Sequence, residues 1–342
     1  MKKTEYPEAA EIAGILKNAK SVVILQADNP DGDSLASALA LEQILSDMDK
    51  EPFLYCGIDI PSYLHHLSGW SRVSKDIPHK FDASIIVDTS SDDLFESLKK
   101  TNLRKSIANK PCIVLDHHPV EAGIPFATVT CNKNVVATGE LIYELAHQLN
   151  WPISLAAKEL IATSIMSDSL GLVSEGTSSR SIQVISELVE NGVSLAKAEA
   201  ARRELMRKSP ELTRYKGQLL QRIEYYDRIA TITIPWEEIH KYSPLYNPSM
   251  LVIDDMRLTE GVDVAIAFKV YRDGKITGKI RTNFNKGIAN DLAFNFGGGG
   301  HRYASGFKIN DGQLIKDVIN ESVKIANQLL DKLDQDNKDA VV

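Results

Sequence analysis

The chain has 342 residues, of which 43% are hydrophobic and 25% are charged, as in a globular protein large enough for two domains. Its 39 Lys and Arg residues against 46 Asp and Glu residues give a formal net charge of −7, which argues against a broad basic face that holds long nucleic acid. The N-terminus lacks the apolar stretch of a signal peptide, and no segment is apolar over the roughly 18 residues of a membrane span. We therefore expect a cytoplasmic protein that binds neither long nucleic acid nor a membrane. A short anionic substrate stays compatible with this charge if metal ions supply local positive charge.

The first half of the chain alternates short apolar runs, rich in Val and Ile, with amphipathic helical patterns. The runs cover residues 22–25, 52–56, 83–87 and 112–115. Short strands of this kind, separated by helices, are typical of a mainly parallel sheet that is covered on both faces. The pattern predicts an α/β domain.

The second half predicts another, smaller α/β domain. Helical patterns dominate residues 138–193, and the charged, glycine-free stretch 194–214 favours a helical connector that breaks near Pro210. Strand patterns follow at 222–234 and 262–280, with a turn at Asp273-Gly274, and a helix fits 312–333. We predict a catalytic domain at 1–193, the connector at 194–214, a substrate-binding domain at 215–335 and a tail at 336–342.

Acidic residues follow three of the apolar runs. Asp31 and Asp33 come after the first run, Asp88 directly follows 83–87, and Asp116 begins an Asp-His-His sequence after 112–115. Because ligands of open α/β sheets bind at the carboxyl ends of parallel strands, we expect these side chains to meet at one edge. Taken alone, Asp31-Gly32-Asp33 is also typical of a simple turn.

Clustered carboxylates raise one another's pKa unless a cation lies among them. Oxygen ligands with one or two imidazoles suit Mn²⁺, with Mg²⁺, Fe²⁺ and Co²⁺ as alternatives. Two such ions can activate water and stabilise an in-line phosphoryl displacement. Asp168 is a further candidate ligand, for which a helix N-cap or a turn is the alternative role.

The stretch Asn295–Phe307 contains four consecutive glycines, Gly297–Gly300, followed by His301 and Arg302. Ordering such a run is entropically unfavourable, so an ordered loop here implies a close backbone approach or positive φ angles. Backbone N–H groups of such a loop can bind phosphate, and a flexible hairpin is the alternative. Arg281, at the end of a predicted strand, is a second candidate for binding an anion.

These motifs together resemble the DHH phosphoesterases, which carry a DHH-associated C-terminal domain. The matching segments, in the order of the family, are Asn29-Pro30-Asp31-Gly32-Asp33-Ser34, Val87-Asp88-Thr89-Ser90, Asp116-His117-His118-Pro119, Ser167-Asp168-Ser169 and Gly297-Gly298-Gly299-Gly300-His301 with Ala304-Ser305-Gly306. The resemblance spans nearly the whole chain.

The resemblance implies a site for two Mn²⁺ ions between the two domains. Asp31 and Asp88 would bind the first ion, and Asp33, Asp88, His117 and Asp168 would bind the second. His118 would face the substrate phosphate, and Asp116 would orient His117 or His118. The substrate-binding residues would be Arg281, Gly298, Gly299, Gly300 and His301.

One position departs from the family pattern. The small soluble members usually carry a His three residues before the Pro of the first motif, where this chain has Ala27. Alanine cannot bind a metal, and strand alternation puts Gln26 and Asp28 on the opposite face. The sequence thus predicts a weakened or altered first metal site.

The resemblance implies a manganese-dependent enzyme that cleaves very short RNA or removes a phosphate from 3′-phosphoadenosine 5′-phosphate, and it is compatible with a homodimer. The alternatives are an exopolyphosphatase, a cyclic-dinucleotide phosphodiesterase, and a nucleotide-binding protein whose turnover is impaired by Ala27.

Overall fold

A computed structural model of the chain describes residues 6–101, 103–118, 123–310 and 312–339. The chain divides into two compact units, Met1–Arg207 and Lys208–Val342, each with a hydrophobic core of its own. None of the helices in the described part combines the length and the apolar character that crossing a bilayer requires.

The first unit is built on a five-stranded sheet in which all strands are parallel, in the order β2-β1-β3-β4-β5. The strands are β1 (Ser21–Gln26), β2 (Glu51–Cys56), β3 (Ala83–Val87), β4 (Cys112–Asp116) and β5 (Val129–Asn132). The α-helices are α1 (Ala9–Asn18), α2 (Gly32–Asp47), α3 (Glu96–Lys99), α4 (Leu103–Ala108), α5 (Thr138–Leu149), α6 (Leu155–Asp168), α7 (Ser179–Glu190) and α8 (Leu195–Leu205). Three short 3₁₀ turns lie at Ser62–Leu64, Trp70–Arg72 and Asp92–Leu94.

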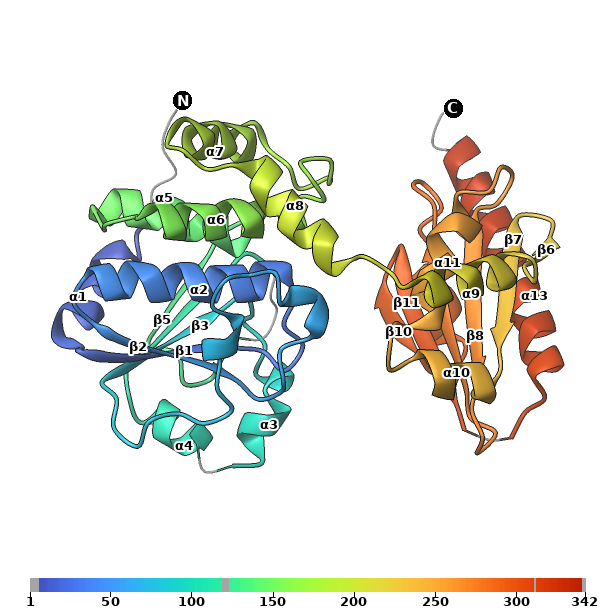
Figure 1. The fold of residues 1–342 in the computed structure, drawn as a ribbon, viewed down its shortest axis with the longest axis horizontal. Helices are drawn as coiled ribbons and strands as arrows, with labels where there is room; N and C mark the ends of the chain where they lie inside the picture. Colours follow the sequence, from blue (N-terminus) through green and yellow to red (C-terminus); the bar gives the residue numbers. More distant parts are fainter. Residues whose placement is uncertain (1–5, 102, 119–122, 311, 340–342) are drawn as a thin grey trace. The chain divides into compact units, whose positions relative to one another are not determined.

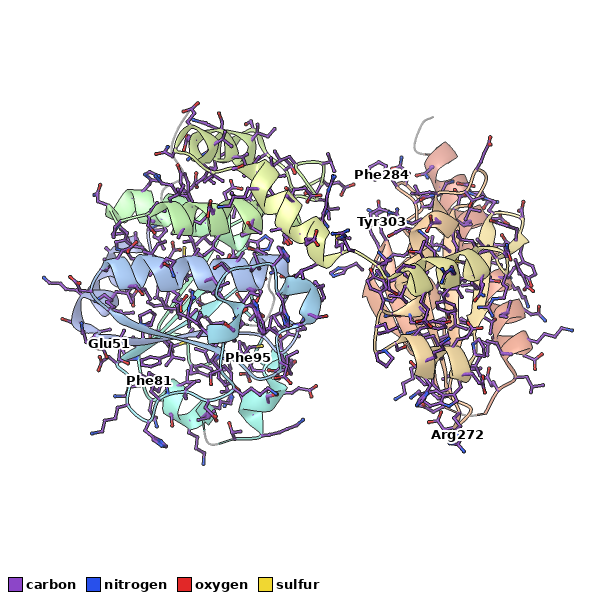
Figure 2. The ribbon with its side chains drawn as sticks, in the orientation of Figure 1. Glu51, Phe81, Phe95, Arg272, Phe284 and Tyr303 are labelled. Carbon is purple, nitrogen blue, oxygen red and sulfur yellow. The ribbon has the colours of Figure 1, made fainter. Side chains whose placement is uncertain are left out.

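Both faces of this sheet are buried. Val22 and Ile24 of β1 pack in the core that includes residues of α1, α2 and α5, whereas Val23 and Leu25 pack on the other face with residues of α3 and α4. Figure 1 shows α2, α5 and α6 on one side of the sheet and α3 and α4 on the other. Phe95, labelled in Figure 2, packs on the face of the sheet that α3 and α4 cover. A strand that is buried on both faces needs a continuous apolar run, which is the pattern that the sequence displays.

The second unit contains a six-stranded mixed sheet in the order β10-β11-β9-β8-β7-β6. Its strands are β6 (Glu224–Tyr226), β7 (Ile229–Ile234), β8 (Val264–Val270), β9 (Ile276–Thr282), β10 (Gly299–His301) and β11 (Ala304–Ile309). Its helices are α9 (Pro210–Leu220), α10 (Trp236–Tyr242), α11 (Pro248–Arg257), α12 (Ala289–Phe294) and α13 (Ile315–Asp339). One face packs against α12 and α13, and the other against α9, α10 and α11.

The predicted α/β class, with a mainly parallel sheet and a second α/β unit, is confirmed. The stretch 194–214 contains helix α8 and the start of helix α9, which are separated at Met206–Ser209, directly before Pro210. Helix α13 extends to Asp339, so the segment predicted as a tail from residue 336 begins as helix.

Candidate metal centre

The candidate ligands lie at the carboxyl ends of adjacent parallel strands. β1 pairs with β3, and β3 pairs with β4, so the segments that follow these strands leave the sheet side by side. Asp88 follows β3, His117 follows β4, and Asp33 lies in the first turn of α2, after β1. Asp168 is the last residue of α6, so it caps no helix N-terminus and does not have the N-cap role considered as an alternative.

Asp31 and Asp33 have different environments. Asp31 is the N-cap of α2, and its Oδ1 accepts a hydrogen bond from the backbone N–H of Ser34 at 3.0 Å. Asp33 is completely buried. A side chain at the intervening Gly32 would force Ser167 of α6 to shift, because a Cβ there would lie 2.2 Å from Oγ of Ser167. This close approach brings the start of α2 against the end of α6, which carries Asp168.

Three donors hold the buried carboxylate of Asp33. Oγ of Ser37 and Oγ of Ser164 donate to Oδ1, and the backbone N–H of Thr138 donates to Oδ2 at 2.7 Å. Ser164 also accepts a hydrogen bond from the N–H of Gly139, and a Cβ at Gly139 would lie 2.1 Å from that hydroxyl oxygen. The carboxylate is therefore fixed by α2, α5 and α6 together. Ser37, Thr138 and Ser164 were not predicted from the sequence, because nothing local distinguishes them from other helix residues.

Asp88 lies in the left-handed backbone region, with a φ of 62°. Among residues other than Gly, Asp and Asn tolerate this region best. Its side chain is only 6% exposed, and Oδ1 accepts a hydrogen bond from the hydroxyl of Thr138 at 3.0 Å. Thr138 thus contacts both buried carboxylates, Asp33 through its backbone and Asp88 through its side chain.

His117 lies at the centre of the cluster. Its Nδ1 is 3.1 Å from the carbonyl oxygen of Val135, which can only accept, so Nδ1 carries the proton and Nε2 keeps its lone pair in the neutral ring. Nε2 is buried and has no hydrogen-bond partner among the residues that the structure describes. It lies 3.5 Å from Oδ2 of Asp33, 3.4 Å from Oδ1 of Asp88 and 3.4 Å from Oδ2 of Asp168.

The electrostatics of this cluster favour an additional positive charge. Burial and the charge of Asp33 raise the pKa of Asp88 well above its usual range. Burial by itself lowers the pKa of His117, but the carboxylates of Asp168, Asp88 and Asp33 outweigh it and raise this pKa to about 11 in the metal-free chain. A proton on Nε2 thus provides the positive charge that a bound cation would supply.

The donor atoms fit a divalent metal ion. The described part of the chain brings together two sets of three ligand atoms, from Asp33, His117 and Asp168 and from Asp88, His117 and His118. Ligand atoms about 2.1 Å from one ion lie roughly 3.0 to 3.4 Å apart, close to the separations around Nε2. A buried imidazole nitrogen without a partner, surrounded by carboxylate oxygens, is a ligand set for Mn²⁺ or a similar ion.

The predicted first metal site is less complete. Asp31 belongs to neither set of ligand atoms, and Ala27 is buried and offers no ligand atom. The side chain of Asp28 accepts a hydrogen bond from the backbone N–H of Ser97 at 2.7 Å. The side-chain oxygen of Gln26 accepts a hydrogen bond from the hydroxyl of Ser34 at 3.4 Å. Both neighbours of Ala27 therefore make contacts within the protein.

Asp116 orients His118. Its Oδ1 lies 2.8 Å from Nδ1 of His118 and accepts from the backbone N–H groups of His117 and His118, while Oδ2 accepts from Ser90 at 2.6 Å. Although burial opposes ionisation, these hydrogen bonds lower the pKa of Asp116, and Asp116 in turn raises the pKa of His118. His118 is 52% exposed, so the far side of its ring is open to a substrate. Pro119, the last residue of this motif, lies outside the described residues.

The glycine run forms a hairpin in the second unit. Gly299–His301 is strand β10, which pairs antiparallel with β11. The N–H groups of Gly297 and Gly298 donate to the carbonyl oxygens of Phe294 and Ala293, and that of Gly300 donates to the side chain of Asn290. Gly299 and His301 are exposed. Arg281 is half-buried on β9 opposite Ala304, and its guanidinium donates to the carbonyl of Ile280.

Two family models match the chain. The model of the DHH family N-terminal domain covers residues 21–176, and that of the DHHA1 domain covers residues 247–332. The chain belongs to the DHH family. The predicted family and the prediction of a phosphoric ester hydrolase are thereby confirmed.

Among proteins similar to this DHH-family chain is the bifunctional oligoribonuclease and PAP phosphatase NrnA of Mycoplasma genitalium, which is 24% identical over 95% of this chain and 98% of its own length. The A-adding tRNA nucleotidyltransferase of Aquifex aeolicus is 24% identical over 88% of this chain, but the chain spans only 35% of that protein. The crystal structure of an exopolyphosphatase-related protein from Bacteroides fragilis has the same fold, with a TM-score of 0.79, 22% identity, and coverage of 95% of this chain and 96% of that one.

Proposed function

We propose that this DHH phosphoesterase is manganese-dependent and hydrolyses phosphoester bonds of short oligoribonucleotides, of 3′-phosphoadenosine 5′-phosphate, or of both. The observation that carries the proposal is the buried, unpartnered Nε2 of His117 with three carboxylate oxygens at 3.4 to 3.5 Å. Similarity to the NrnA protein over nearly the full length of both chains supports this choice of substrates. A cytoplasmic location and a homodimer stay predictions.

Asp33, Asp88, His117 and Asp168 would bind one ion, and Asp31 with Asp88 would contribute to a second. When bound, such ions supply positive charge to phosphoryl oxygens and lower the pKa of water. The protein's own contribution is to fix its ligands before the ion binds, through the hydrogen bonds of Thr138 and Ser164.

His118 has a role that does not depend on ligation in this proposal. Because Asp116 accepts the Nδ1 proton and raises the pKa of the ring, a protonated His118 presents its Nε2–H to solvent. This N–H can donate to a phosphoryl oxygen and stabilise the negative charge that develops there. Asp116 acts through His118 and is a positioning residue.

The test is manganese-dependent turnover of a 5′-labelled RNA dinucleotide beside 3′-phosphoadenosine 5′-phosphate. We expect the native protein to hydrolyse at least one of them and the Asp88→Asn variant to hydrolyse neither, because Asn keeps the side-chain volume and tolerates the left-handed backbone but removes the charge. Activity of Asp88→Asn equal to native would refute the role of this cluster.

The Ala27→His variant, measured in parallel, tests the altered first site. Turnover that appears only after Ala27→His would identify the native chain as a nucleotide-binding protein with an impaired first metal site. Hydrolysis of polyphosphate alone, with neither nucleotide cleaved, would favour the exopolyphosphatase alternative.

A further inference from the structure

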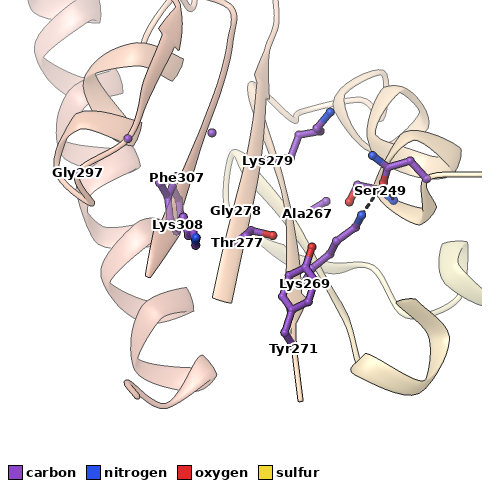
Figure 3. Close-up of a pocket in the computed structure, with 13 residues that line it drawn as sticks. Ser249, Ala267, Lys269, Tyr271, Thr277, Gly278, Lys279, Gly297, Phe307 and Lys308 are labelled. Atoms are coloured by element: carbon purple, nitrogen blue, oxygen red, sulfur yellow. Dashed lines mark hydrogen bonds between the residues drawn. The ribbon is translucent and has the colours of Figure 1, made fainter. Parts of the chain in front are cut away.

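A cavity lies on the sheet of the C-terminal unit, mainly on the face of β8, β9 and β11 that is turned away from α12 and α13 (Figure 3). Its volume is about 420 Å³, within the range of small-molecule sites. The polar residues that line it include Asn247, Ser249, Lys269, Tyr271, Lys279 and Lys308. Gly297 and Gly298 of the glycine run also line it, and the polar side chains have no role in the proposed function.

The strand alternation directs charged side chains into this cavity. In β9, Ile276, Gly278 and Ile280 are buried, whereas Thr277, Lys279 and Arg281 alternate with them on the other face and are half-buried. Lys279 pairs with Ala267 of β8 and Gly306 of β11, so it has small neighbours on both sides. A position between small residues on a half-buried face would accommodate an apolar side chain, yet the chain has a lysine there.

Two lysines of the cavity, Lys269 and Lys279, contact uncharged groups. Nζ of Lys269 donates to Oδ1 of Asn247 at 2.7 Å, which a dashed line marks in Figure 3, and Nζ of Lys279 lies 3.2 Å from the weakly accepting Sδ of Met250. Among the described residues, neither ammonium group forms an ion pair with a carboxylate. Burial lowers the pKa of both lysines. The positive charge of Lys279 lowers the pKa of Lys269 further, and that of Arg281 lowers the pKa of Lys279 further.

The start of α11 adds a further electrostatic contribution. Asn247 is its N-cap and accepts a hydrogen bond from the N–H of Ser249 at 3.2 Å, and both residues line the cavity. Helix N-termini carry partial positive charge and favour anions. Two half-buried ammonium groups without counter-charges and one helix N-terminus therefore converge on the same space. This arrangement of positive charge favours a multiply charged anion.

We propose that this cavity binds a phosphate group of the substrate other than the one that is hydrolysed. This inference rests on the proposed function and narrows it, because the preferred substrate must then carry at least two phosphate groups. A 5′-phosphorylated dinucleotide, 3′-phosphoadenosine 5′-phosphate and a polyphosphate chain satisfy this condition. A dinucleotide with a single internal phosphodiester does not.

The first experiment measures binding of inorganic pyrophosphate to the full chain by calorimetry in buffer with a chelator, so that no divalent ion bridges the anion to the carboxylates. We expect Lys279→Met and Lys269→Met each to weaken binding by about tenfold to hundredfold, the loss expected for one charge-assisted contact. Lys316→Met removes the same charge from exposed α13, which packs on the other face, and should bind like native protein. Equal binding by native protein and Lys279→Met would overturn the inference.

We expect the Lys279→Met variant to fold, because the substitution replaces a half-buried charge, without an acidic partner among the described residues, by an apolar side chain. Its thermal unfolding temperature should equal or exceed that of native protein. If Lys279→Met unfolds instead, Lys269→Met serves as the test, and unweakened pyrophosphate binding by that variant overturns the inference.

The second experiment compares KM for a 5′-phosphorylated RNA dinucleotide and for the same dinucleotide without the 5′-phosphate. Native protein should favour the phosphorylated one, and Lys279→Met should bring the ratio of the two KM values close to one. Tripolyphosphate in the binding assay distinguishes a polyphosphate chain from a nucleotide as the better ligand.

The failure of this inference and of the proposed function can be distinguished. If native protein binds pyrophosphate through Lys279 but hydrolyses no phosphoester, the proposed function fails and the anion site stands. If hydrolysis is normal while Lys279→Met changes neither pyrophosphate binding nor the KM ratio, the proposed function stands and this inference fails.

Discussion

Thr138 offers a sharp test of how the protein prepares its metal ligands. The Thr138→Val substitution nearly preserves the shape of this completely buried residue and retains the backbone N–H that donates to Asp33, but it deletes the hydroxyl that donates to Asp88 at 3.0 Å. A hydrogen bond to a charged group contributes about 1.5 to 3 kcal/mol. Since about 1.4 kcal/mol corresponds to a tenfold change in affinity, we expect Mn²⁺ binding to weaken by about tenfold to hundredfold.

The assay is a Mn²⁺ titration followed by electron paramagnetic resonance or calorimetry, with Thr138→Ser as the matched control. Serine retains the hydroxyl and loses only a methyl group, so its Mn²⁺ affinity should stay much closer to native. Thermal unfolding of each metal-free variant shows whether the fold is intact. Native affinity in Thr138→Val, or an equal loss in Thr138→Ser, would refute the argument that the hydroxyl positions Asp88.

Three further predictions concern the same centre. Asp116→Asn removes the charge that raises the pKa of His118, so this pKa, followed by NMR of the ring protons, should fall; an unchanged pKa would contradict the assigned contact. The raised pKa of His117, about 11 against about 6.5 in the unfolded chain, stabilises the metal-free fold fully below pH 6.5, and this contribution is lost as the pH rises toward 11. The free energy of unfolding of metal-free native protein should therefore decrease between pH 7 and about 10, and it should decrease less in His117→Gln. If the free energy of unfolding has the same pH dependence in both proteins, this role of His117 is contradicted. Gly32→Ala should weaken Mn²⁺ binding because its Cβ overlaps Ser167, and Ser167→Gly should restore part of the loss in the double variant; no restoration would mean that the overlap is not the cause.

The fold was largely predictable because the strands of the first sheet are buried on both faces. Continuous apolar runs such as Ala83–Val87 identify these strands with little ambiguity. Strand β5 escaped prediction because it has only four residues at the edge of the sheet, with Thr130 exposed and Asn132 polar. Helices α10, α11 and α12 were also missed, because they are short and interrupt a region dominated by strand patterns.

The candidate site was predictable only as far as its acidic and imidazole residues. Asp33, Asp88 and His117 follow strands, and strand ends of a parallel sheet share one edge. Two of the residues that hold them, Thr138 and Ser164, come from α5 and α6, whose packing against α2 is a tertiary contact without a local signal. The phosphate-binding role expected of the glycine N–H groups was based on composition, which does not reveal that those of Gly297, Gly298 and Gly300 donate to residues of α12.

The two units have separate hydrophobic cores, and this separation has an evolutionary consequence. The residues that would bind metal belong to the first unit, whereas Lys269, Lys279 and the start of α11 belong to the second. Mutations that alter the anion-binding face need not disturb the packing around Asp33 and His117. Substrate preference could therefore diverge among descendants of one ancestral gene while the hydrolytic centre stayed under unchanged purifying selection.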